Sequence, residues 1–192
     1  MKQDLINGNT YNNNNWVFHI KHILDNCGLS YLWINQNNML INFSLIKQRM
    51  IDIFKQSWYS DINNSKRLKS YAIFKHSFEL ETYLTDIENS NFRKALTQFR
   101  TSSHNLAVEA GRYTNQDRNE RICTNCNMRQ IETEYHFLLI CPKHRELRLK
   151  YFSNYFCSWP SINKFVTLMS MQSKAKTIKL AKFIYYANCN RN

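Results

Sequence analysis

Residues Arg121–His144 read RICTNCNMRQIETEYHFLLICPKH, and this stretch decides how the rest of the sequence is interpreted. Within it, Cys123, Cys126, His136 and Cys141 have the spacing C-x2-C-x9-H-x4-C. Three thiolates and one imidazole are the donors that a tetrahedral structural zinc site uses, and four protein ligands leave no open position for a catalytic water. The spacing therefore predicts a structural Zn2+ site.

The residues between these ligands predict how the chain brings them together. A two-residue turn between the first two cysteines can direct both sulfurs to one side, and Ile122 and Ile131 are expected to flank it as a short β-hairpin. From Glu132 onward the apolar pattern is helical, which places His136 in the first turns of a helix. Cys141 lies five residues further on, away from that helical face, but the proline after it disfavours helical backbone there. Its sulfur can then turn back toward the metal.

A second ligand set uses His144 in place of His136, with the spacing C-x2-C-x14-C-x2-H. His136 is preferred because it lies in the closer position, whereas His144 begins a polar stretch. Both sets stay open at the level of the sequence.

Four segments around this stretch resemble a known protein family: Arg100–Leu106 (RTSSHNL), Glu109–Arg112 (EAGR), Arg118–Cys126 (RNERICTNC) and Glu134–Pro142 (EYHFLLICP). They are similar to the zinc-binding region at the C-terminal end of non-LTR (LINE-type) retroelement polyproteins, downstream of the reverse transcriptase. The resemblance is specific from about residue 93 to residue 151. It implies a region that binds RNA or DNA in support of target-primed reverse transcription, and it suggests association with a retroelement polymerase.

Composition predicts a mostly α protein in which the zinc-stapled β-hairpin is a small, knuckle-like addition. The 192 residues are 43% hydrophobic and contain only 3 Gly and 2 Pro, which favours helices around a sizeable core. No apolar run is long enough for a membrane span, and the N-terminus lacks an apolar signal core. Cysteines outside the metal pattern are scattered. We therefore expect a soluble intracellular protein, nuclear or cytoplasmic, in a reducing compartment.

The sequence suggests four regions. Residues 1–15 are polar and Asn-rich and are expected to form a disordered leader; residues 16–92 carry helical patterns and read as a helical scaffold. Residues 93–157 would form the zinc-binding, reverse-transcriptase-associated domain, and residues 158–192 basic C-terminal helices. In the helix expected after residue 89, Arg100 is predicted to point outward.

Positive charge is concentrated in and beyond the zinc segment. The net charge is +12, and residues 1–92 carry 9 Lys and Arg against 8 Asp and Glu. Residues 93–150 carry 11 against 6, and residues 159–192 carry 6 against none. Such a basic region attracts phosphate backbones. The candidate nucleic-acid contacts are the cations nearest in sequence to the four predicted metal ligands, a segment that we call the knuckle (residues 121–144). They are Arg118, Arg121, Arg129, Lys143, Arg145 and Arg148.

Two tyrosines, Tyr135 and Tyr151, could stack on unpaired bases if they are exposed, although core packing is the preferred explanation for both.

Nothing in the sequence predicts an enzyme. The chain contains no Asp-Asp pair of the kind that holds the two metals of a polymerase, and it has no Gly-rich phosphate loop or nucleophile elbow. Caps and ion pairs explain His104, Glu109 and Arg112 better than acid–base chemistry does. The main prediction is a zinc-binding, nucleic-acid-binding module without polymerase or endonuclease activity. The alternatives are a zinc-stabilised helical protein-interaction module and a decayed retroelement remnant.

Overall fold

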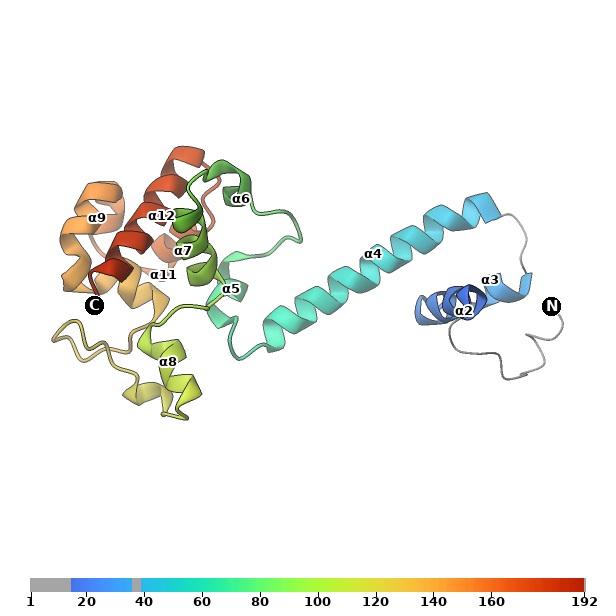
Figure 1. Cartoon of the computed structure of the whole chain (residues 1–192), viewed down its shortest axis with the longest axis horizontal. Coiled ribbons are helices and arrows are strands. Elements are labelled where there is room, and N and C mark those ends of the chain that lie inside the picture. Colours follow the sequence, from blue (N-terminus) through green and yellow to red (C-terminus); the bar gives the residue numbers. More distant parts are fainter. Residues whose placement is uncertain (1–14, 36–38, 192) are drawn as a thin grey trace. The chain divides into compact units, whose positions relative to one another are not determined.

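Helices make up most of the computed structural model, which describes residues 15–35 and 39–191, so the predicted mostly α fold is confirmed. The helices are α2 (Trp16–Asn26), α3 (Ser30–Asn35), α4 (Met39–Asn64), α5 (Lys69–Phe74), α6 (Tyr83–Asp86), α7 (Ser90–Arg100), α8 (Ala107–Tyr113), η1 (Arg118–Glu120), η2 (His136–Ile140), η3 (Pro142–His144), α9 (Arg145–Tyr151), α10 (Asn154–Cys157), α11 (Ile162–Met169) and α12 (Lys174–Cys189) (Figure 1).

The predicted β-hairpin does not form as a pair of strands. Among the described residues, β pairing is limited to one isolated antiparallel bridge, between Ile122 and Ile131. The ladder has no room to extend, because η1 ends at Glu120 on one side and the chain becomes helical at Glu134 on the other. The two isoleucines do flank the turn, but a single bridge holds them.

The chain divides into two compact units, residues 1–60 and 61–192. In the first unit the Asn15 side chain caps α2 by accepting a hydrogen bond from the backbone N–H of Val17 at 3.1 Å. The helix stops before Gly28, whose φ of 68° is the left-handed conformation that glycine adopts without strain. A small core forms from Leu24, Cys27 and Leu29. Apart from Asn15, the predicted disordered leader lies outside the described residues.

The second unit is built around α7 and α12, which pack along each other (Figure 1). The α7 positions Ala95, Leu96 and Phe99 fall on one helical face and are buried. Along α12 a wider set is buried: Leu180, Ala181, Phe183, Ile184 and Ala187. Aromatic rings from other elements complete this core, including Phe137 and Phe165.

One continuous core therefore joins residues from Phe74 to Ala187. The boundaries suggested by the sequence, at residues 92/93 and 157/158, both lie within the second unit. Charge and composition change at those positions. The same core nevertheless continues across both of them, because α12 packs against α7 and α9, which precede it in the chain.

None of the helices in the described part of the chain has both the length and the apolar character needed to cross a membrane.

Candidate metal centre

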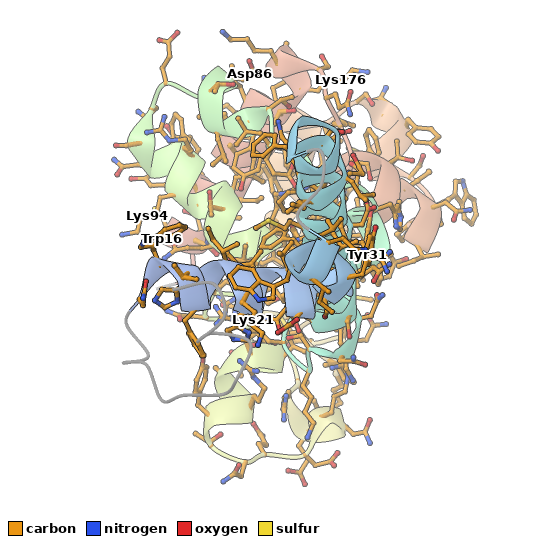
Figure 2. The ribbon with its side chains drawn as sticks, turned by 90° about the vertical axis from the view of Figure 1, so that its right-hand side faces the viewer. Trp16, Lys21, Tyr31, Asp86, Lys94 and Lys176 are labelled. Atoms are coloured by element: carbon orange, nitrogen blue, oxygen red, sulfur yellow. The ribbon has the colours of Figure 1, made fainter. Side chains whose placement is uncertain are left out.

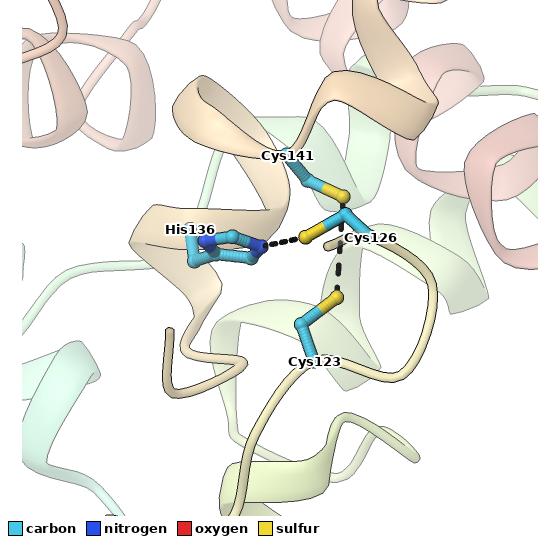
Figure 3. Close-up of side chains that lie close together, drawn as sticks. All are labelled: Cys123, Cys126, His136 and Cys141. Carbon is cyan, nitrogen blue, oxygen red and sulfur yellow. Dashed lines mark hydrogen bonds between the residues drawn. The ribbon is translucent and has the colours of Figure 1, made fainter. Parts of the chain in front are cut away.

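The first two candidate ligands lie in a tight turn closed by the backbone. The Cys123 N–H donates to the Gln130 carbonyl at 2.9 Å, and the Glu132 N–H donates to the Arg121 carbonyl at 2.9 Å. These two bonds frame the turn, so that Cys123 is buried and Cys126 half-buried, with both sulfurs on the same side (Figure 3). The predicted turn geometry is therefore present even though a full hairpin is not.

A π-helical turn supplies the other two ligands. The Cys141 N–H donates to the His136 carbonyl at 2.8 Å, a bond that spans five residues where an α-helix would span four. This wider turn brings two residues that are five apart toward one site. Cys141 itself has φ −50° and ψ 117°, outside the helical region, as Pro142 after it requires. The predicted departure of Cys141 from the helix is confirmed; the π turn was not foreseen.

The four side chains converge on one point (Figure 3). The ligand atoms of Cys123, Cys126, His136 and Cys141 all lie within 4.8 Å of one another. The sulfurs of Cys123 and Cys141 are 4.0 Å apart, and the Cys126 sulfur is 3.4 Å from His136 Nε2. Donors about 2.3 Å from a metal at the corners of a tetrahedron would be about 3.8 Å apart, so these separations suit a single bound ion.

The pKa shifts of the cluster residues indicate that a bound cation would stabilise the ionised thiolates. Burial, followed by the nearby Cys141 and Glu132, raises the pKa of Cys123 to about 12. Burial also raises the pKa of Cys141 and lowers that of His136, which keeps the imidazole in the neutral form that binds metals. Ionised thiolates packed this closely require a compensating positive charge, and a metal ion would supply it.

A second layer of side chains orients the ligands. His136 Nδ1 lies 3.2 Å from Gln130 Oε1, so the ring donates there and directs Nε2 toward the sulfurs. Glu132 Oε1 is 3.6 Å from the Cys123 sulfur and accepts from Asn125 Nδ2 at 3.3 Å. The Glu132 carboxylate also accepts from the Ala107 N–H at 2.7 Å, and it pairs with Arg191 at 3.0 Å.

Replacing Gln130 with Ala is expected to weaken metal affinity about 10- to 100-fold while leaving the fold intact, since it removes an orienting partner and no ligand. Competition with a chromogenic chelator measures the affinity. Gln130→Glu keeps an acceptor for His136, so its metal affinity should stay close to that of the wild type. The exposed Gln172→Ala is the matched control. Equal affinities for Gln130→Ala and Gln172→Ala would show that Gln130 does not support the site.

The alternative ligand His144 is not part of the cluster. Its ring is buried, with its centroid 4.6 Å from that of Phe137 and 6.2 Å from that of Phe183. Burial, together with nearby positive charges, lowers its pKa to about 4. The arrangement favours His136 as the fourth ligand and gives His144 a place in the core.

Glu134 forms a further anchor that the sequence did not reveal. Its buried carboxylate accepts from Ser70 Oγ at 2.8 Å and from Ser102 Oγ at 3.0 Å, and it lies 3.1 Å from His104 Nε2. Burial alone would raise the Glu134 pKa, but the hydrogen bond and charge of His104 outweigh it and lower the pKa. Residues 102–104 are thereby tied to the start of the turn that carries His136. His104 and Glu109 are not paired with each other: Glu109 forms an ion pair with Arg112, at 2.9 Å between Oε2 and the guanidinium nitrogen.

The six candidate nucleic-acid contacts fall into two groups. Four of them are exposed: Arg118, Arg129, Lys143 and Arg145. Arg121 is half-buried and donates to the carbonyls of Gln116 and Val108, with its closest bonds at 2.7 Å. Arg148 is only 5% exposed, and its guanidinium donates to the Leu138, Ile140 and Cys141 carbonyls. The assignment of Arg148 as a phosphate contact is therefore wrong, because its donors are already bonded inside the protein.

The two candidate stacking tyrosines are half-buried. Tyr135 packs edge-on against Phe165, with the ring centroids 6.1 Å apart. Tyr151 lies parallel to Tyr186, with a centroid separation of 6.1 Å. Core packing accounts for Tyr135, whereas Tyr151 belongs to a partly open aromatic group.

Comparison with family models, curated proteins and solved structures gives no match.

Proposed function

We propose that this protein is a zinc-binding, nucleic-acid-binding module, without polymerase or endonuclease activity of its own, related to the post-polymerase region of non-LTR retroelement proteins. The observation that carries the proposal is a buried Cys3His cluster next to a group of exposed cations. The resemblance in residues 93–151 supports the retroelement relationship.

Zinc is the metal that this donor set fits best. Three thiolates and an imidazole are soft to borderline ligands, and a closed tetrahedral set of this kind is typical of structural zinc rather than of magnesium or calcium, which prefer oxygen. When bound, zinc would act as a structural cross-link between the turn at residues 123–130 and the π turn η2. In this proposal the bound metal fixes the positions of the side chains around it.

The neighbouring surface suits a polyanion. Arg118 and Arg129 lie in or beside the turn that holds the first two cysteines, and Lys143 and Arg145 directly follow Cys141. Lys143 and Arg145 line an open hollow of about 640 Å3, in which Glu146 is the single acidic side chain among the described lining residues. Four exposed cations held by one rigid centre can contact several phosphates at once, and each contact releases counterions.

The exposed cations provide the test. Binding of a fluorescent oligonucleotide by the wild type should weaken with salt, with a slope in a log–log plot of about −0.7 to −0.9 per phosphate contacted. Converting Arg118, Arg129, Lys143 and Arg145 to Gln should reduce that slope by about three. Anisotropy titrations between low and moderate salt measure both.

The matched control converts four exposed lysines, Lys66, Lys69, Lys174 and Lys176, to Gln. The α12 lysines lie near the start of that helix, roughly 20 Å at 1.5 Å per residue from its last residue, Cys189, which lines the hollow with Lys143 and Arg145. A control slope equal to that of the wild type would locate binding at the knuckle. Absence of RNA and DNA binding by the wild type at low salt would reject the proposal and favour a protein-interaction module.

A further inference from the structure

A hollow of about 450 Å3 lies where the first part of α7 meets the end of α12. Asn91, Lys94 and Gln98 reach it from one face of α7, at helical spacings of three and four residues, while Tyr185 and Asn188 reach it from α12. Arg191 and residues 103–105 complete the wall, and none of the described residues that line it is Asp or Glu. The hollow therefore offers amide and cationic donors to an electron-rich or anionic ligand.

A group of aromatic rings, which we call the aromatic face, adjoins the hollow. It consists of Phe92, Tyr151, Tyr185 and Tyr186. Tyr185 lines the hollow and also packs against Phe92 and Tyr186, at centroid distances of 5.2 and 5.3 Å. Tyr186 is 40% exposed and lies parallel to Tyr151. The hollow and the aromatic face are thus one continuous surface.

Lysines accompany these rings. Lys182 Nζ lies 5.9 Å from the centre of the Phe92 ring, and Lys150 Nζ lies 5.4 Å from the centre of the Tyr151 ring. Lys94 is exposed at the rim of the hollow, and Figure 2 shows its side chain at the edge of the ribbon. Neither α7, which carries Lys94, nor α12, which carries Lys182, contains an acidic residue, whereas α9 has Glu146 four residues before Lys150. Flat rings interleaved with cations match the alternation of bases and phosphates in a nucleic acid strand.

From these observations we infer that the hollow and the aromatic face bind single-stranded RNA or DNA, with an unpaired base against the tyrosines and phosphates at Lys94, Lys150 and Lys182. This inference rests on the proposed nucleic-acid-binding function and adds strand selectivity to it. The volume is in the range of pockets that hold small ligands, so a flipped-out base can enter. A regular duplex keeps its bases stacked inside and presents no ring to the tyrosines.

Contacts link this surface to the metal centre. Arg191, in the wall of the hollow, donates to the Asn105 carbonyl at 3.2 Å and to Glu132 Oε2 at 3.0 Å. The other Glu132 oxygen faces the Cys123 sulfur. These bonds tie the chain just after α12 to the candidate metal centre, and Cys189 lines both this hollow and the one that Lys143 and Arg145 line.

The test compares a 12-nucleotide single strand, as RNA and as DNA, with a blunt duplex of the same sequence. We expect the wild-type chain to bind the single strands at least about tenfold more tightly than the duplex, because only unpaired bases stack. Tyr186→Ala should weaken single-strand binding about 5- to 100-fold and leave duplex binding unchanged, whereas Tyr186→Phe, which keeps the ring, should resemble the wild type.

Two exposed lysines provide a second pair of variants, because their side chains can be replaced without disturbing the packed core. Lys94 lies at the hollow, and Lys176 lies near the other end of α12, where Figure 2 also shows it extending from the ribbon. Lys94→Glu should lower single-strand affinity about tenfold, and Lys176→Glu, with the same change of charge, should have a clearly smaller effect.

The outcomes separate the two proposals. Equal affinities for single strand and duplex, or equal losses in Lys94→Glu and Lys176→Glu, would overturn this inference and leave general nucleic-acid binding in place. A wild type that binds neither form at low salt would overturn both. A preference for one of the two single strands would show whether the surface distinguishes RNA from DNA.

Discussion

Replacing Cys126 with Ser and His136 with Ala in one chain is expected to abolish binding of the proposed zinc ion and to unfold the turn at residues 121–131. This turn is held by one β-bridge, a few backbone bonds and its two candidate ligands, Cys123 and Cys126, whereas Phe137 and Leu138 anchor the following helical turn in the core. Ordering each residue costs roughly 1–2 kcal/mol in backbone entropy. A structural zinc ion supplies on the order of 10 kcal/mol when it binds, so a bound ion would be the largest stabilising contribution to this turn.

Native mass spectrometry under reducing conditions measures the metal content, and hydrogen exchange locates the unfolding. The Cys123 amide, which donates to the Gln130 carbonyl in the folded turn, should lose its protection in the double variant. The matched control is Cys189→Ser with His76→Ala, two exposed positions outside the cluster, which should keep both zinc and protection. Freshly purified, reduced and folded wild type without zinc would refute the metal centre.

The cluster of candidate ligands could be predicted because cysteine and histidine at this spacing are visible in a short stretch of sequence. The spacing left two histidines open, and since both are buried it is their position that separates them: His136 lies in the cluster with the sulfurs, while His144 packs against Phe137 and Phe183. The π turn could not be read from apolar periodicity. The five-residue interval from His136 to Cys141 was the available signal, since it equals the span of a π-helical hydrogen bond.

Charged residues were the least predictable part of the site. Glu132 and Glu134 read as ordinary polar positions, yet both are buried, because their partners lie up to 64 residues away in the chain. Arg100 was expected to point outward. It is buried instead, with its guanidinium 4.6 Å from the Phe74 ring centre and 3.0 Å from Glu81. Helical periodicity shows which face carries charge, but it does not show whether a distant segment covers that face.

The unit boundaries show the same limit on a larger scale. The sequence suggested a change of domain where the basic C-terminal helices begin, at residue 158. In the structure, the buried face of α12 packs on α7 and contributes to the core that includes Phe137. A change in charge composition along the sequence indicates which segments carry an exposed basic surface. A domain boundary depends instead on contacts between segments far apart in sequence.

The second large effect is expected at Arg148, where replacement by Met should lower the free energy of unfolding of the second unit by about 2–4 kcal/mol. The guanidinium bonds to the carbonyls of Leu138, Ile140 and Cys141, the last at 2.6 Å. The Leu138 and Ile140 carbonyls lie at the end of the π turn and lack the usual helical partners, whereas the Cys141 carbonyl also accepts from the His144 N–H at 3.2 Å. Methionine fills similar volume but leaves the Leu138 and Ile140 carbonyls unsatisfied, at about 1–3 kcal/mol for each buried group.

Arg145→Met is the matched control, because Arg145 lies three residues earlier in the same helix and is exposed. Arg145→Met should change the free energy of unfolding by no more than about 0.5 kcal/mol. It should weaken oligonucleotide binding more than Arg148→Met does, when both proteins are compared under conditions in which they are folded. Hydrogen exchange of buried α12 amides across a urea series measures the stability of this unit. Arg148→Lys should also be destabilising, since one ammonium cannot reproduce a planar fork of donors to three carbonyls. If Arg148→Met were as stable as Arg145→Met and bound nucleic acid more weakly, Arg148 would be a surface contact and the buried bonding described above would be wrong.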